Sequence, residues 1–98
     1  MAHIIWAPKA LADFEALLDY IARDAPAAAV RFGEKLLVRV ESLARFPESG
    51  SLVPEDDSQT YREFFQGQYR IIFRTENNVV YITAIHHAAR LLDTTDLR

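Results

Sequence analysis

Two arginines and two adjacent histidines are the residues of this chain whose types and positions could do chemistry. Arg62 and Arg70 stand among aromatic residues in the stretch YREFFQGQYRIIF, and His86 and His87 follow near the C-terminal end. A guanidinium group holds a carboxylate or a phosphate through directional, charge-assisted hydrogen bonds, and an imidazole transfers protons near neutral pH. Because neighbouring residues on a strand face opposite sides, only one of the two histidines can join the arginines.

Other kinds of site are not expected. The chain has no cysteine, which removes disulfides, thiolate nucleophiles and cysteine-based zinc sites. Its three histidines, His3, His86 and His87, do not suggest a zinc site, because adjacent histidines on a strand cannot chelate the same ion. A net charge of −3 argues against nucleic acid as the main ligand, since binding phosphates normally needs a basic excess. We therefore expect no metal and no cofactor.

The elements that must position these residues can be predicted from periodicity. The 98 residues predict one domain, because a second core would not fit. Apolar residues at helical spacing predict helices from Pro8 to about Asp24 and from Pro26 to about Phe46. The expected strands are residues 3–6, 60–66, 68–75 and 79–87, with turns at residues 66–68 and 76–78. The order β-α-α-β-β-β predicts a two-layer α+β fold, with a helical hairpin packed on one face of a small, mostly antiparallel sheet.

Alternation along the expected strands indicates which side chains face the helices. The residues expected on the helix side are Tyr69, Ile71, Phe73, Val80, Ile82 and Ala84. The opposite side then carries Arg70, Ile72, Arg74, Tyr81, Thr83 and Ile85. We expect this opposite side to be uncovered, and an exposed surface with so many apolar residues usually receives a partner.

The same alternation does not assign the histidines. Strict parity places His86 on the helix side and His87 on the open side, but a bulge or strand end within residues 84–87 would reverse this. The arginines also have structural alternatives, namely an ion pair of Arg62 with an acid elsewhere and of Arg70 with the end of the first helix or with the tail. The acidic run Glu55-Asp56-Asp57 is expected to be a solvated loop.

A series of short motifs runs through the chain in a fixed order. These are Trp6-Ala7-Pro8, Leu43-Ala44-Arg45-Phe46-Pro47 with Gly50, Tyr61-Arg62-Glu63-Phe64, Tyr69-Arg70-Ile71-Ile72-Phe73, and Ile85-His86-His87 with Arg90. Together they resemble the RelE/ParE superfamily, the toxins of type II toxin–antitoxin modules. Two positions depart from the family pattern. Ser51 stands where members often carry arginine, and Ala7 precedes Pro8 where a capping serine is common.

The resemblance implies two alternative activities. RelE-like members cut messenger RNA on the ribosome, and in that case the catalytic residues would be Arg62, Arg70, His86, His87 and Arg90. ParE-like members poison DNA gyrase without being enzymes. We favour the ParE-like branch, because the net charge is −3, residues 88–93 after the last strand supply one arginine, Arg90, and no tyrosine follows Tyr81. A third alternative is a degenerate binding module that no longer harms cells.

The resemblance also implies the partners. A ParD-like antitoxin would wrap the helical hairpin with a segment that is disordered when free, and would add backbone bonds at a sheet edge. The residues expected to bind it are Arg62, Arg70, Ile72, Tyr81 and Ile85. DNA gyrase would be the target, and operator DNA would be bound only through the antitoxin. The chain shows neither a membrane-spanning run nor a leader, so we expect a cytoplasmic protein without a membrane partner.

Overall fold

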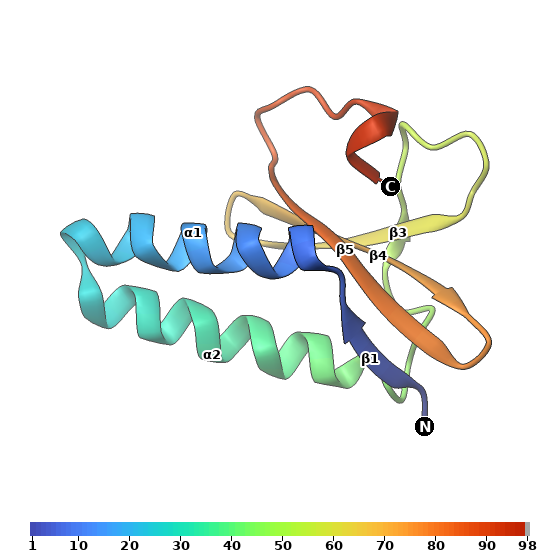
Figure 1. Ribbon diagram of the computed structural model, residues 1–98, viewed down its shortest axis with the longest axis horizontal. Helices are drawn as coiled ribbons and strands as arrows, with labels where there is room; N and C mark the ends of the chain where they lie inside the picture. Colours follow the sequence, from blue (N-terminus) through green and yellow to red (C-terminus); the bar gives the residue numbers. More distant parts are fainter. Residues whose placement is uncertain (98) are drawn as a thin grey trace.

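The computed structural model describes residues 1–97, and the side chains of all of these except Thr94 and Asp96. It confirms the two-layer α+β fold, with a helical hairpin packed on one face of a five-stranded sheet (Figure 1). The elements are β1 (His3–Trp6), α1 (Pro8–Asp24), α2 (Pro26–Ser42), β2 (Ser51–Leu52), β3 (Tyr61–Gln66), β4 (Tyr69–Glu76), β5 (Val79–His87) and the 3₁₀ turn η1 (Thr94–Leu97). The short β2 and η1 were not expected, and α2 ends four residues before Phe46. Neither helix could span a membrane.

A single residue joins the two helices. Ala25 closes α1 by donating its backbone N–H to the carbonyl of Ile21 at 3.0 Å, and its own carbonyl accepts the first bond of α2 from Ala29 at 3.1 Å. Proline occupies the first turn of both helices, where its missing N–H costs nothing. The helices pack closely at Gly33, where a Cβ would lie 3.3 Å from Leu18. The result is the tight antiparallel hairpin that the sequence predicts.

The sheet has the order β1-β5-β4-β3-β2, in which β1 pairs with β5 in parallel and the other pairs are antiparallel. Asn77 and Asn78 both have positive φ values, of 50° and 63°, as a two-residue turn between β4 and β5 requires. The β3–β4 connection is also a two-residue turn, Gly67-Gln68, because Gln66 pairs directly with Tyr69. The three-residue turn expected at 66–68 is therefore one residue too long.

The main core lies between the helices and the sheet. It includes Phe14 and Leu36 from the helices and Ile71, Phe73 and Ile82 from the strands, so these strand residues face the helices as predicted. The ring of Trp6 stacks on that of Phe14 with 5.3 Å between centroids, which anchors β1 to α1.

A bulge in β5 changes which of its side chains face the helices. Ile72 pairs with Ala84 and Phe73 pairs with Ile82, so Thr83 is an extra residue whose hydroxyl donates to the carbonyl of Ile72 at 3.2 Å. Beyond this point the alternation is reversed. Ala84 packs with Ile72 on the side away from the helices, and Ile85 joins the helix-side core. The predicted sides of Ala84 and Ile85 were therefore wrong.

The face of the sheet turned away from α1 and α2, here called the far face, is covered by the chain itself. Ile72 and Ala84 form a second buried cluster with Val53, from the segment after β2, and with Leu92 and Leu97, from the C-terminal segment. In Figure 1 these two segments lie on the side of the sheet opposite the helices. The prediction of an uncovered far face is wrong at this cluster. Alternation along a strand predicts which side chains face away from the helices. It does not predict whether a distant segment of the chain covers them.

Candidate functional site

The far face holds a cluster of three charged side chains, in which Arg70 lies between Glu63 and Glu55. Its Nε donates to Oε1 of Glu63 at 2.6 Å, while Nη1 and Nη2 donate to the two carboxylate oxygens of Glu55 at 2.7 and 2.8 Å. The side chain of Arg70 is 7% exposed and that of Glu63 is 5% exposed, whereas Glu55 is 35% exposed at the rim. We call this arrangement the Arg70 clamp. It joins β3, β4 and the loop after β2 with charge-assisted hydrogen bonds.

The clamp lowers the pKa of Glu55 and raises the pKa of Arg70, and both shifts favour the charged forms. The hydrogen bonds from Arg70 lower the pKa of Glu55 below its ordinary value of 4.5, in spite of partial burial. The hydrogen bond to Glu55 raises the pKa of Arg70 above its already high value, so the guanidinium stays charged. Next to the clamp, Asp56 accepts hydrogen bonds from the hydroxyl of Ser58 and from the backbone of Thr60 and Tyr61, and these lower its pKa. The acidic run is therefore an organised loop as well as a solvated one.

Acid is expected to loosen the loop at residues 53–60. Because the folded-state pKa of Glu55 is depressed, its contribution to stability is fully present above 4.5 and is lost as the pH falls through the lowered value. Urea unfolding midpoints measured from about pH 6 down to about pH 2 should fall less steeply for Glu55→Gln than for the wild type. Identical profiles for the two proteins would show that the clamp does not hold the loop in solution.

His86 is the histidine that shares the far face with Arg70. The bulge in β5 makes it the direct cross-strand partner of Arg70, so the reversal left open by the sequence is what the structure adopts. Its Nε2 atom is buried and has no hydrogen-bond partner within residues 1–97. Arg70 and His86 are thus the two candidate catalytic residues that the fold brings side by side.

Arg62 lies on the other face of the sheet. It pairs with Phe73, whose side chain is in the helix-side core, and its Nη1 donates to the carbonyls of Gly50 at 2.8 Å and Glu48 at 3.3 Å. Arg62 therefore fixes the loop after α2 by binding carbonyls, and it forms no ion pair with the described side chains. The expectation that Arg62 and Arg70 share one surface is wrong, because the β3–β4 turn has two residues and sets a different register.

The remaining candidates are dispersed. His87 faces α1, where its ring meets that of Tyr69 edge-on at 5.1 Å and its Nδ1 accepts from the N–H of Ala89 at 3.0 Å. Arg90 is exposed in the segment after β5, and the ring of half-buried Tyr81 lies 4.3 Å from the guanidinium carbon of Arg74. Ile85 is buried against the helices. The five residues named for catalysis and the five named for antitoxin binding do not form one surface in either case.

Glu55 and Glu63 were missed as partners of Arg70. A two-residue turn at Gly67-Gln68 places Phe65 opposite Arg70, which makes Glu63 a diagonal neighbour of Arg70 on the same face. The correct turn length would therefore have indicated this pair from the sequence. No comparable signal exists for Glu55, because its loop reaches Arg70 only through the fold. Among the described residues, no group of three histidine, aspartate or glutamate side chains could hold a metal ion.

Comparisons with known proteins give consistent matches. Residues 4–92 match the protein family described as ParE toxin of type II toxin-antitoxin system, parDE. The chain is 39% identical over 92 residues to Toxin RelE2 of Caulobacter vibrioides, covering 93% of this chain and 100% of that protein. Its fold is similar to a chain of the chromosomal ParDE system from P. aeruginosa, with a TM-score of 0.73 and 21% identity over 89% of this chain and 96% of that one. It is also similar to a chain of the toxin-antitoxin complex RelBE2 from Mycobacterium tuberculosis, with a TM-score of 0.53 and 20% identity over 88% and 96%.

Proposed function

The chain belongs to the RelE/ParE superfamily as the toxin of a type II toxin–antitoxin module, and from this premise we propose that it poisons DNA gyrase without being an enzyme. The proposal includes a ParD-like antitoxin that neutralises the toxin and through which the complex binds operator DNA. All of these partners work in the cytoplasm, where we place the protein. The family match at residues 4–92 carries the ParE description, and this favours the ParE-like branch.

The Arg70 clamp is the observation that carries the proposal. Cleavage of RNA by its own 2′-hydroxyl needs a free cation to stabilise the charged phosphorane, and a base and an acid beside it. The guanidinium of Arg70 is already bound by two carboxylates, and both carboxylates would repel a phosphate. Arg62, His87 and Arg90 lie away from Arg70, so they cannot take its place.

Purified toxin is expected to trap gyrase on DNA. In a plasmid assay with gyrase and ATP, adding the chain should produce linear DNA after denaturation of the enzyme with detergent, because stabilised cleavage complexes are released as breaks. Toxin mixed beforehand with its antitoxin is the matched control and should leave the plasmid intact. Normal supercoiling and relaxation without trapped breaks, at a toxin concentration that stops growth in cells, would rule the proposal out.

A RelE-like nuclease is the second candidate, because the bulge in β5 places His86 beside Arg70 and one relative bears the RelE2 name. An acid–base group and a cation on one face are part of what RNA cleavage requires. Primer extension on translated messenger RNA distinguishes the two proposals. Codon-phased cuts that disappear with His86→Ala would support the nuclease, whereas unbroken messages during growth arrest would exclude it.

A further inference from the structure

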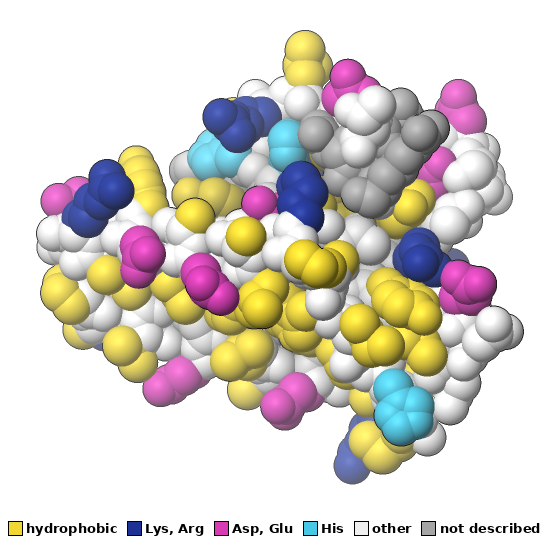
Figure 2. All heavy atoms as spheres, viewed as in Figure 1, with side chains coloured by type: hydrophobic (Ala, Val, Ile, Leu, Met, Phe, Trp, Pro, Cys, Tyr) yellow, Lys and Arg dark blue, Asp and Glu magenta, His cyan; other side chains and the backbone are white. Residues whose placement is uncertain are grey.

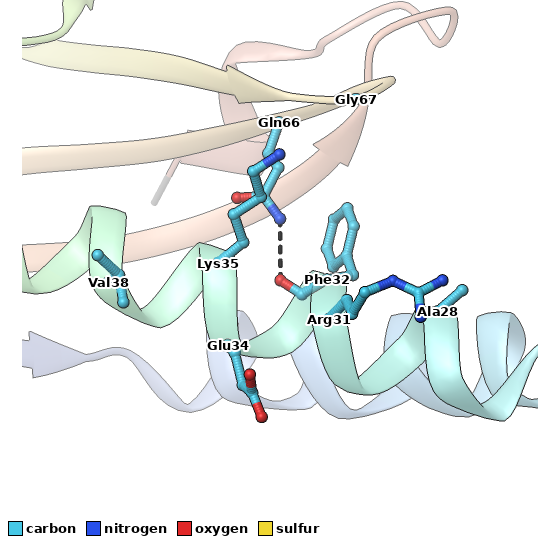
Figure 3. Close-up of a pocket in the computed structure, with 8 residues that line it drawn as sticks. All are labelled: Ala28, Arg31, Phe32, Glu34, Lys35, Val38, Gln66 and Gly67. Carbon is cyan, nitrogen blue, oxygen red and sulfur yellow. Dashed lines mark hydrogen bonds between the residues drawn. The ribbon is translucent and has the colours of Figure 1, made fainter.

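A hollow lies between α2 and the turn that joins β3 to β4. It consists of two adjoining parts that share Lys35, Val38, Gln66 and Gly67. Figure 3 shows Lys35 and Gln66 meeting between the helix and the turn, where Nε2 of Gln66 donates to the carbonyl of Phe32 at 2.9 Å. This hydrogen bond fixes the turn against the helix. We call the feature the α2–turn hollow.

Charges of opposite sign are segregated around α2. Arg31, Lys35 and Arg39 follow one another at intervals of four residues, so they form a ridge along the side that lines the hollow. Glu34 and Glu41 are seven residues apart and share another side of the helix. Figure 3 shows Glu34 pointing away from the turn, and Figure 2 shows acidic side chains, in magenta, along the helical hairpin. The hollow therefore has a positive potential on a chain whose net charge is −3.

The cations of this ridge are not neutralised by the fold. Arg31 and Lys35 are exposed and form no ion pair with any described side chain. Arg39 stacks on the ring of Phe64 at 4.6 Å, which orients its guanidinium without a carboxylate partner among the described residues. Like charges four residues apart on a helix repel each other, so the ridge lowers stability unless an anion covers it.

The turn adds a backbone donor to the hollow. Gly67 has a φ of 58°, and its N–H forms no hydrogen bond within the described part of the chain. Nothing lies within 4 Å of the place that a Cβ would take at Gly67, so a ligand can come close to its backbone. Free backbone N–H groups and the side chains of arginine and lysine are the groups with which proteins bind the phosphates of nucleic acids.

The length of the ridge favours a repeating anion over a single ion. Eight residues of helix separate Arg31 from Arg39, which corresponds to about 12 Å along the helix axis. Each strand of a DNA duplex carries one phosphate per roughly 3.4 Å of its axis, so about three phosphates of one strand fit this length. A phosphodiester backbone therefore reaches all three cations, whereas a free phosphate ion does not.

We propose that the α2–turn hollow binds the phosphate backbone of the DNA segment that gyrase holds. Arg31, Lys35 and Arg39 contact one strand, and the N–H of Gly67 donates to a phosphate oxygen. This inference rests on the proposed function, because gyrase supplies the DNA. The net charge of −3 opposes binding of DNA by the toxin alone, but a toxin already bound to gyrase meets the DNA at a high effective concentration. A poison that holds the enzyme and the DNA at once opposes release of the broken DNA.

The plasmid assay with gyrase and ATP tests this contact. Arg31→Glu/Lys35→Glu should require about tenfold to a hundredfold more toxin for half-maximal linear DNA, because two phosphate contacts are lost and two repulsions are added. Plotted as logarithms, the dependence of this dose on salt should lose about two units of slope. Arg23→Glu/Arg45→Glu makes the same change in net charge at exposed positions outside the hollow, and should stay within about threefold of the wild type.

Three further measurements identify the occupant. Both double variants should unfold in urea at the midpoint of the wild type, because all four positions are exposed. Without DNA, both should bind gyrase within about threefold of the wild type by calorimetry, since the enzyme contact lies elsewhere. Replacing chloride with inorganic phosphate at equal ionic strength should leave the dose of the wild type unchanged, because a single ion does not span the ridge.

Four results would overturn the assignment of the hollow. Trapping by the hollow variant at the dose of the wild type would do so, and a loss of antitoxin affinity beside it would make an acidic peptide the occupant. An equal loss of trapping in the two double variants would indicate a general charge effect. Weaker binding of the hollow variant to gyrase without DNA would make the enzyme the occupant, and competition by inorganic phosphate would make it a free ion. Wild-type toxin that traps no DNA would instead remove the proposed function, and this inference with it.

Discussion

Replacing Arg70 with methionine is expected to lower the free energy of unfolding by about 3–5 kcal/mol, because the carboxylate of Glu63 would remain buried without its partner. This is a large share of the stability of a small domain. The double variant Arg70→Met/Glu63→Leu should recover most of the loss, since a buried ion pair can often be exchanged for apolar residues of similar volume. Urea unfolding of the three proteins measures the two differences.

A small effect of Arg70→Met would contradict the structural role of the Arg70 clamp. If Arg70→Met alone cost less than about 1 kcal/mol, Arg70 would behave like a surface charge. Its guanidinium would then be free to bind a phosphate or a partner, and the argument against a nuclease site on the far face would fail.

The second large effect on stability is expected from removing the two leucines that cover the far face, Leu92 and Leu97. Leu92→Ala/Leu97→Ala should lower the free energy of unfolding by about 4 kcal/mol, because each substitution removes a buried side chain from the cluster around Ile72. Leu97 belongs to a single 3₁₀ turn, which can shift to close part of the cavity. The expected sum is therefore near the low end of the range for two buried Leu→Ala substitutions. Unfolding in urea, together with binding of an apolar dye to the exposed cluster, gives the measurement.

The neighbouring Leu91 supplies the control for this pair. It is 97% exposed, so Leu91→Ala should change the stability by less than about 0.5 kcal/mol. If the double variant cost no more than Leu91→Ala, the C-terminal segment would not be seated on the sheet in solution, and Ile72 would be available to a partner after all.

The sequence was sufficient for the elements that depend on local patterns. Both helices follow from apolar spacing between two proline starts, and the three long strands follow from alternation between turns at Gly67 and at Asn77. Packing of the hairpin on one face of the sheet then followed from the order of the elements. The side of Ile71 and Phe73 was also predictable, because the extra residue of the bulge lies in β5 and leaves the alternation along β4 unbroken.

The candidate site was not predictable, since it depends on two single-residue shifts and on distant segments. A turn of two residues at Gly67-Gln68 puts Arg62 and Arg70 on opposite faces, and the extra residue Thr83 moves His86 to the far face. Each shift reverses every side chain beyond it. The covering of Ile72 and the binding of Glu55 to Arg70 are contacts between segments far apart in sequence, which no periodic pattern records.

These corrections alter where the chain can meet other molecules. The far face appeared from the sequence to be a docking surface, but its centre is filled by an ion cluster and by apolar side chains of the chain itself. Apolar side chains that remain exposed to partners include those of the helical hairpin, such as Leu37 and Val38. The occupied far face supports the proposal that the chain acts by binding a target rather than by cleaving RNA.

Induced expression of the chain without its antitoxin tests this account most directly. Two responses are followed in the same culture, namely a DNA-damage reporter and primer extension on translated messenger RNA. Poisoning of gyrase predicts that growth stops with a rise in the reporter and with intact messages, in the wild type and in His86→Ala alike. Codon-phased cuts without DNA damage, lost with His86→Ala, would contradict the account, and normal growth at good yield would indicate a module that no longer harms cells.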